Sequence, residues 1–151
     1  MIVTDETVAQ ALPLTPDASV RQDVTFTEAD VDSFGRVSGD RASLHFDERY
    51  AIAQGFSGRI VHGLLLGARF SRLMGMFLPG ENSVIQTLSL RYRRPVRVGT
   101  RLTMAVELDR FSESVGAVML KLSATADGQV VLDGTAQCVL CRPHGTGPAT
   151  T

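Results

Sequence analysis

One segment limits the fold of this chain more than any other. Residues Val61 to Phe77, drawn as a helix, are apolar on nearly every side. A helix with so little polar surface has to be buried. After Pro79-Gly80 the hydrophobic period changes from helical to two, which predicts that β-strands cover this helix.

Four alternating runs follow that break and predict a meander of antiparallel strands. The residues expected on one face are Val84, Leu88, Leu90 and Tyr92, then Leu102, Met104, Val106 and Leu108, then Val118, Leu120 and Leu122, and finally alternate positions of Val130 to Leu140. Asp127-Gly128 predicts a hairpin turn, and Arg21–Phe26 predicts an earlier strand in the same sheet. A curled antiparallel sheet wrapped around one long central helix is an α+β arrangement, the single hotdog domain.

Two shorter helices are expected before the central one. Thr27 is a good N-cap and begins a helix that ends near Gly39. A second helix begins near Ser43 and ends at Gly55. We therefore divide the chain into an N-terminal arm (residues 1–19), a hotdog domain (20–142) and a disordered tail (143–151).

The composition fits one globular domain. The chain has 151 residues, enough for one core, and its 15 basic and 16 acidic side chains give a net charge of −1. Such a balance provides no field to attract nucleic acid or an anionic membrane. No run reaches the roughly 18–20 apolar residues of a membrane span. The acidic N-terminus does not resemble a signal peptide, so we expect a cytoplasmic protein.

The two cysteines, Cys138 and Cys141, form a C-x-x-C pair. In a strand, residues three apart point to opposite faces, which argues against a redox pair. No second cysteine pair completes a zinc site, so we expect structural cysteines.

An acid and an imidazole, Asp40 and His45, lie five positions apart across a glycine-containing turn. A junction between a loop and a helix can bring both side chains into one pocket, where they hold and deprotonate a water. Alone, such a pair is more often a turn-capping aspartate and a core histidine, so it does not establish a catalytic role.

A second motif, Phe56-Ser-Gly-Arg-Ile-Val-His-Gly63, leads directly into the buried helix. The first amides of a helix have no internal partner and carry partial positive charge. Gly63 has no Cβ, so a carbonyl oxygen can approach its amide closely, and this amide can stabilise negative charge on that oxygen.

Together these motifs resemble the MaoC-like, (R)-specific enoyl-CoA hydratase family. The resemblance rests on Ser38-Gly39-Asp40 with Leu44-His45, followed by Ile60-Val-His-Gly63, and extends over about Arg21 to Leu140. It implies a hydratase/dehydratase that interconverts a 2-enoyl thioester and an (R)-3-hydroxyacyl thioester of CoA or acyl carrier protein. It implies Asp40 and His45 as the catalytic pair and Gly63 as the oxyanion amide. Ser38 and His62 are also expected to bind the substrate, although a histidine directly before a buried helix more often holds a loop by hydrogen bonds.

No metal and no cofactor is expected, because a thioester already acidifies the neighbouring carbon. Arg93 and Arg94 are expected to contact the phosphates of CoA or phosphopantetheine, although a solvated sheet face explains them equally well. A single sheet covers only part of the central helix and leaves strand edges open, which predicts a homodimer or a dimer of dimers.

The chain departs from the family pattern at two places: Ala42-Ser43 stands where the family has Asn-Pro, and Ala68 stands where the family often has a serine one turn into the central helix. The asparagine helps to order the active-site turn by hydrogen bonds that alanine lacks. This change leaves two alternatives open, a non-catalytic subunit that binds acyl thioesters and a hotdog thioesterase. Acyl chain length and the physiological direction of the reaction do not follow from the sequence.

Overall fold

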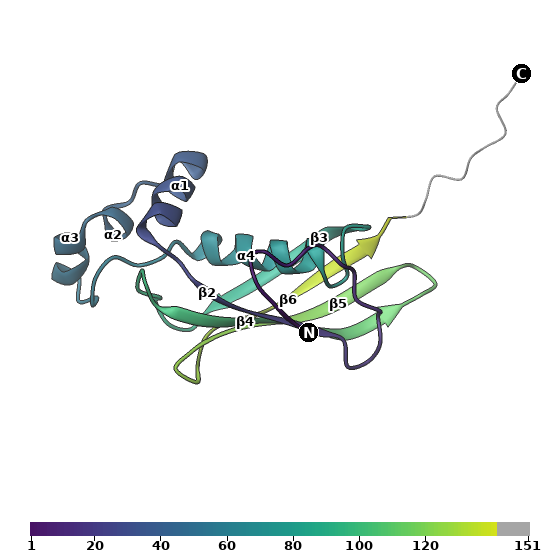
Figure 1. Ribbon diagram of the computed structural model, residues 1–151. Coiled ribbons are helices and arrows are strands. Elements are labelled where there is room, and N and C mark those ends of the chain that lie inside the picture. The colour runs from purple at the N-terminus through teal and green to yellow at the C-terminus, as the bar shows by residue number, and fades with distance from the viewer. Residues whose placement is uncertain (142–151) are drawn as a thin grey trace, which may run out of the picture.

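The computed structural model describes residues 1–141 of the chain, and the arrangement of its elements is shown in Figure 1. The strands are β1 (Ile2–Val3), β2 (Ser19–Thr25), β3 (Ser83–Tyr92), β4 (Arg101–Ser112), β5 (Ala117–Ala126) and β6 (Gln129–Leu140). The helices are α1 (Glu28–Ser38), α2 (Ser43–Phe46), α3 (Glu48–Ala53) and α4 (Gly63–Met76).

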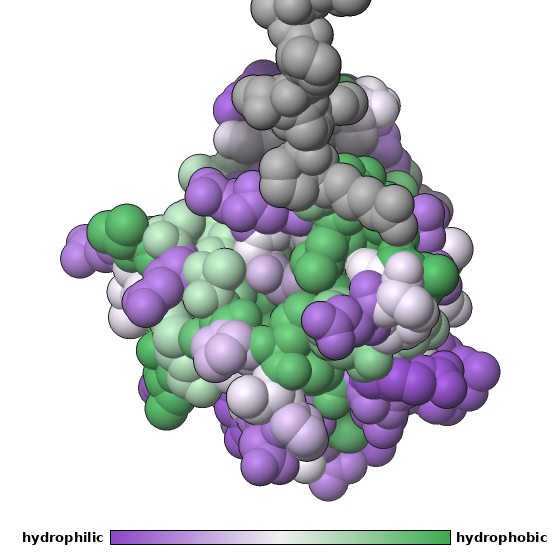
Figure 2. Space-filling model, turned by 90° about the vertical axis from the view of Figure 1, so that its right-hand side faces the viewer, coloured by the Kyte–Doolittle hydropathy of each residue, from purple (hydrophilic) through white to green (hydrophobic). Residues whose placement is uncertain are grey.

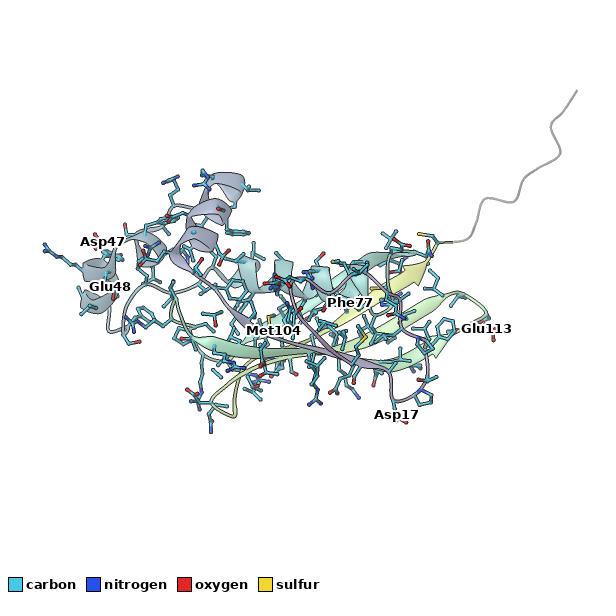
Figure 3. All side chains as sticks on the ribbon, viewed as in Figure 1. Asp17, Asp47, Glu48, Phe77, Met104 and Glu113 are labelled. Carbon is cyan, nitrogen blue, oxygen red and sulfur yellow. The ribbon has the colours of Figure 1, made fainter. Side chains whose placement is uncertain are left out.

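The strands form one sheet in the order β1-β2-β4-β5-β6-β3, antiparallel throughout except for the short β1–β2 pair. Helix α4 lies along one face of this sheet, while α1, α2 and α3 gather beyond one end of it (Figure 1). Phe77 and Met104, both fully buried, lie between the helix and the sheet (Figure 3). The expected α+β hotdog arrangement is therefore confirmed.

Helix α1 begins and ends as the sequence predicts. The Thr27 hydroxyl accepts from the Asp30 amide, and the Asp30 carboxylate accepts from the Thr27 amide, which closes a capping box. At the other end Gly39 adopts φ 77°, a left-handed conformation that favours glycine, and this turns the chain toward Asp40.

The single helix expected from Ser43 to Gly55 is wrong in one respect, because Asp47 divides it into α2 and α3. The Asp47 side chain accepts from the Tyr50 amide, so this residue acts as an N-cap in the middle of the predicted helix. Asp is favoured at caps for this local hydrogen bond.

The N-terminal segment, expected as a loose arm, instead packs against the domain. The amides of Gln10 and Leu12 donate to the carbonyls of Met76 and Phe77 at 3.0 and 2.8 Å. Val3 is 2 % exposed, and Leu12 and Leu14 pack against the core. These apolar residues have no regular spacing, so periodicity did not reveal their burial. The predicted tail, residues 143–151, lies outside the described residues.

The predicted inner face of β3 also needs a correction. Val84 was expected beside Leu88, but the register shifts between Ile85 and Thr87, and such a bulge reverses which side chains face the core. Ile85 and Leu88 pair with Cys138 and Ala136, two buried residues, whereas Val84 is 59 % exposed. The Asp127-Gly128 turn joins β5 to β6 as predicted, with both residues at positive φ.

The surface mixes hydrophobic and polar side chains, as Figure 2 shows for the end of the molecule that carries the β4–β5 hairpin. No helix among residues 1–141 is long and apolar enough to span a membrane. Both cysteines are free, with Cys138 buried and Cys141 exposed.

Candidate active site

Asp40 stands in a turn that its own neighbours hold in place. The Ser38 hydroxyl donates to the Phe34 carbonyl at 2.7 Å and accepts from the Asp40 amide at 3.1 Å. Asp40 Oδ1 then accepts from the Ala42 amide at 3.1 Å. The turn is thus ordered by local bonds between side chains and backbone even without the family asparagine. Asp40 is exposed, and its Oδ2 has no hydrogen-bond partner among residues 1–141.

His45 is fixed by a bond that also determines its tautomer. Its Nδ1 lies 2.8 Å from the Ile60 carbonyl oxygen, which can only accept, so Nδ1 carries the proton. In the neutral ring Nε2 is then an unprotonated acceptor. This nitrogen is available to a water or a substrate group.

His62 contacts both Asp40 and His45. It is 1 % exposed, its ring stacks on that of His45 with centroids 3.8 Å apart, and its Nε2 donates to the Asp40 carbonyl at 3.1 Å. Burial is the main cause that lowers the pKa of His62 below its ordinary value, and the neighbouring His45 acts in the same direction. The ring is therefore neutral, and it joins the start of α4 to the turn of Asp40.

Arg59 connects the same turn to helix α1. Its Nε donates to the His45 carbonyl at 2.7 Å, and its guanidinium contacts Asp32 at 3.1 Å and Glu28 at 3.4 Å. The Arg59 side chain is only 12 % exposed. Arg59 belongs to a motif noted in the sequence, but the motif does not indicate a role for it. Its partners, the His45 carbonyl and two carboxylates of α1, lie in separate segments of the chain.

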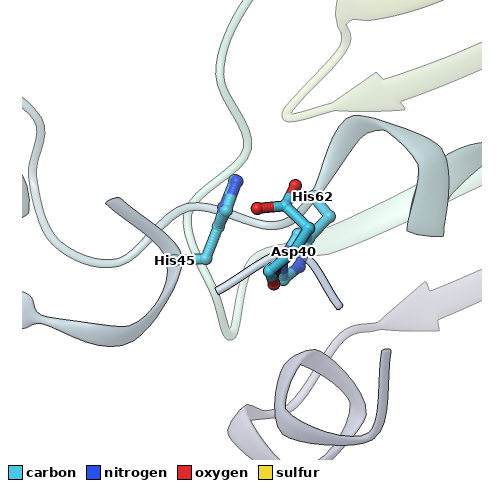
Figure 4. A group of neighbouring side chains, drawn as sticks. All are labelled: Asp40, His45 and His62. Carbon is cyan, nitrogen blue, oxygen red and sulfur yellow. Dashed lines mark hydrogen bonds between the residues drawn. The ribbon is translucent and has the colours of Figure 1, made fainter. Parts of the chain in front are cut away.

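The ligand atoms of Asp40, His45 and His62 lie within 4.8 Å of one another, and Figure 4 shows the three side chains gathered from separate segments. Carboxylate and imidazole groups this close together can hold a metal ion in other proteins. However, the lone pair of an imidazole nitrogen lies in the plane of its ring, and the His45 and His62 rings are stacked with centroids 3.8 Å apart and planes only 25° apart, so their lone pairs lie in two separate planes. A tetrahedral ion needs ligands that converge at about 2.0–2.1 Å, and this arrangement does not fit one.

A cavity of about 380 Å³ opens beside this group. His45, Gly63, Arg93 and Arg94 line it, together with an apolar wall of Phe56, Ile60, Val61, Leu66, Pro95 and Val96, and with Tyr92. The volume is within the usual range of ligand pockets. The structure therefore brings His45, the helix start at Gly63 and both predicted arginines to one cavity.

The predicted site residues differ in what surrounds them. Ser38 and His62 do not line the cavity and instead hold Asp40. Arg93 forms a salt bridge of 2.6 Å with Asp133, whose carboxyl pKa falls below its usual value mainly because of this bond. Among residues 1–141, Arg94 has no such carboxylate partner.

Tyr92 lines the cavity but was predicted only as a strand residue. Its ring lies so close to Gly63 that a Cβ on this glycine would be 2.9 Å from Tyr92 Cζ. Burial raises the pKa of the Tyr92 phenol above its ordinary value. In the sequence, Tyr92 is an alternating residue of a predicted strand beside several arginines. This pattern does not indicate that its ring contacts Gly63.

The arrangement has the parts that acid–base chemistry on a polarised carbonyl compound needs. Asp40 Oδ2 and His45 Nε2 are acceptors on neighbouring groups, and together they can bind both hydrogens of one water. Gly63 is the first residue of α4, so its amide has no acceptor within the helix. The fold and the site together define a hotdog protein with an acid–imidazole pair beside a helix N-terminus.

Comparison with known proteins agrees with this class. The model of the MaoC-like domain family matches residues 10–126, and the chain belongs to this family. A 3-hydroxybutyryl-CoA dehydratase of Methylorubrum extorquens is 33 % identical over 110 residues, which cover 73 % of this chain and 70 % of the relative. An (R)-specific enoyl-CoA hydratase of Rhodospirillum rubrum is 32 % identical over 112 residues, covering 74 % of this chain and 78 % of the relative.

Relatives also include a mitochondrial 3-hydroxyacyl-[acyl-carrier-protein] dehydratase of Arabidopsis thaliana, 32 % identical over 125 residues, with 80 % of this chain and 74 % of the relative covered. Among solved structures, the (R)-hydratase from A. caviae involved in PHA biosynthesis aligns with a TM-score of 0.80 and 33 % identity. That alignment covers 87 % of this chain and 99 % of the hydratase.

Proposed function

We propose that this protein is a hydratase/dehydratase that interconverts a 2-enoyl thioester and an (R)-3-hydroxyacyl thioester. The observation that carries the proposal is the group formed by Asp40 and His45 next to the start of α4. The carboxylate lies within 4.8 Å of the imidazole ligand atom, and His45 and Gly63 line the same cavity. Relatives with hydratase and dehydratase names support the same reaction.

In the hydration direction, one water lies between Asp40 Oδ2 and His45 Nε2, with a hydrogen directed to each. Its oxygen attacks C3 of the enoyl group while Asp40 takes one of its protons. The electrons of the double bond move toward the thioester carbonyl, and the Gly63 amide stabilises the charge on that oxygen. The proton that Asp40 has taken then passes by way of His45 Nε2 to C2, which restores the Asp40 carboxylate. One water has thus added across the double bond.

Ser38 and His62 act in this proposal as positioning residues. Ser38 accepts from the amide of Asp40 and His62 donates to its carbonyl, so the two hold the backbone of Asp40 on both sides of its Cα. Burial lowers the pKa of His62, so the ring that stacks on His45 is neutral.

The carrier is CoA or acyl carrier protein, since relatives are named for each. Arg94 lines the cavity and is free to bind a phosphate, whereas Arg93 is already paired with Asp133. We therefore assign the phosphate contact to Arg94 rather than to Arg93. The preferred substrate is identified by measuring hydration rates on enoyl-CoA thioesters of several chain lengths. The same acyl groups are then measured on an acyl carrier protein.

The test of the catalytic pair uses two variants, Asp40→Asn and His45→Ala. Each is expected to lower turnover about 10²- to 10⁴-fold, the usual contribution of a general acid or base. Loss of the conjugated enoyl thioester absorbance measures the rate. Asp17→Asn is a matched control, because this exposed aspartate lies far from the site near the opposite end of the molecule (Figure 3).

A variant that keeps most of the wild-type rate would remove its residue from the mechanism. A wild-type protein that binds enoyl thioesters without converting them would favour the non-catalytic alternative. Release of free thiol, followed with a thiol-reactive dye, would favour the thioesterase.

A further inference from the structure

Tyr92 is the last residue of β3 and closes one side of the cavity that contains His45 and Gly63. Its phenol ring faces the first residue of α4 without an intervening side chain. A Cβ on Gly63 would lie 2.9 Å from Tyr92 Cζ and 3.2 Å from the Tyr92 hydroxyl oxygen. The hydroxyl is therefore close to the helix N-terminus at which a substrate carbonyl is expected.

The distance between the two donor groups can be bounded. A Cβ lies about 2.5 Å from the amide nitrogen of its own residue, as the covalent geometry requires. Added to the 3.2 Å contact, this places the Tyr92 hydroxyl within about 5.7 Å of the Gly63 nitrogen. Two hydrogen bonds of about 2.7–3.2 Å each can meet at one oxygen across such a separation.

The hydroxyl is also in the right state to donate. Burial is the one cause that raises the pKa of Tyr92, and no hydrogen bond from residues 1–141 contributes to the shift. The phenol therefore keeps its proton across the physiological range and has no competing acceptor among these residues. Arg93 follows directly in the chain, but its guanidinium is directed to Asp133.

We propose that the Tyr92 hydroxyl is a second donor to the thioester carbonyl oxygen, beside the Gly63 amide. This inference rests on the proposed hydratase function and adds a catalytic residue to it. In the step toward the 3-hydroxyacyl product, negative charge grows on the carbonyl oxygen as water attacks C3. Two donors already in place stabilise this charge more than one does, and they hold the conjugated system in a fixed orientation.

The kinetic test is Tyr92→Phe, which keeps the ring against Gly63 and removes only the hydroxyl. We expect kcat to fall about 10- to 100-fold with a smaller change in KM, because loss of one oxyanion donor reduces transition-state stabilisation. Tyr50→Phe is the matched control. The two tyrosines are the only ones in the chain and each is 46 % exposed, but Tyr50 lies on α3 and does not line the cavity.

A second measurement observes the carbonyl directly. In the Asp40→Asn background, where turnover of the bound enoyl thioester is expected to be at least about 10²-fold slower, the infrared stretch of a ¹³C-labelled thioester carbonyl reports its hydrogen bonds. The band is expected to move to higher frequency when Tyr92→Phe is added, and to stay in place when Tyr50→Phe is added. Circular dichroism of each variant confirms the fold.

The outcomes separate the two proposals. An unchanged kcat and an unshifted carbonyl band in Tyr92→Phe, with Asp40→Asn inactive, would overturn the role of Tyr92 and leave the proposed function intact. A higher KM alone would overturn it too, since the hydroxyl would then contact another part of the substrate. A wild-type protein without hydratase activity would overturn both proposals.

Discussion

Gly63 lies directly against the ring of Tyr92, and the lack of a side chain at this position has a steric reason as well as a chemical one. A Cβ would lie 2.9 and 3.0 Å from two ring atoms of Tyr92, closer than side-chain contacts normally allow. The same small residue lets a carbonyl approach the first amide of α4. One glycine therefore keeps open both the cavity wall and the proposed oxyanion site.

This contact leads to a prediction for Gly63→Ala. The added methyl group pushes the Tyr92 ring outward and narrows access to the amide, so we expect the hydratase rate to fall at least 10-fold. Gly75→Ala in the same helix is the control, because nothing lies within 4 Å of a Cβ there. That control is expected to keep its activity and to gain about 0.5–1 kcal/mol of stability in denaturant unfolding. Equal activity of the two variants would contradict the steric argument.

Among the elements of residues 1–141, α2 is the shortest helix and carries His45 of the proposed catalytic pair. Ala42 precedes it without a side-chain cap, and its backbone has φ −56° and ψ 133°. Those angles suit the residue before a proline, and Ser43 holds the first helical position, where proline is favoured. The backbone thus already has the conformation that the family sequence Asn-Pro would require.

We predict that Ser43→Pro raises the free energy of unfolding by about 0.4–1 kcal/mol. A proline that fits the native backbone reduces the conformational freedom of the unfolded chain. Urea unfolding measures the change, with Ser43→Ala as the control for loss of the hydroxyl. A destabilised Ser43→Pro protein would mean that the turn differs from the one described.

At the scale of the whole molecule, the chain alone leaves an apolar face and a long strand edge uncovered. Strand β3 stands at one end of the sheet order and spans Ser83–Tyr92, so one side of it has no partner strand among the described residues. Leu64 on α4 is 71 % exposed, and Leu88 on β3 is 40 % exposed. Pairing with a second copy would cover both features, as predicted from the sequence.

We therefore expect sedimentation equilibrium to give at least twice the 16.3 kDa chain mass at micromolar concentration. Leu64→Glu is expected to weaken this association, because it places a charge on the exposed apolar side of α4. Val37→Glu is the control: Val37 is 88 % exposed on α1, at a distance from β3 along the molecule (Figure 1). A wild-type species of single-chain mass, active as a hydratase, would rule out the dimer.

The sequence determined those features whose cause is local or periodic. The apolar residues of α4, the alternation in β4 and the cap at Thr27 each act through near neighbours, so the central helix, the strands of the meander and the ends of α1 were predictable. The Asp40–His45 turn and the glycine at the start of α4 were also found from the sequence, since they lie within short motifs.

Only the tertiary structure decided which groups meet across long separations in the chain. The roles of Arg59, Tyr92 and the buried His62 depend on contacts with α1, α4 and the Asp40–His45 turn, and no local pattern encodes them. The bulge in β3 and the packing of residues 1–19 are similar cases, because both arise where one segment adjusts to another. Periodicity records which face of an element is apolar, whereas a site depends on which faces come together.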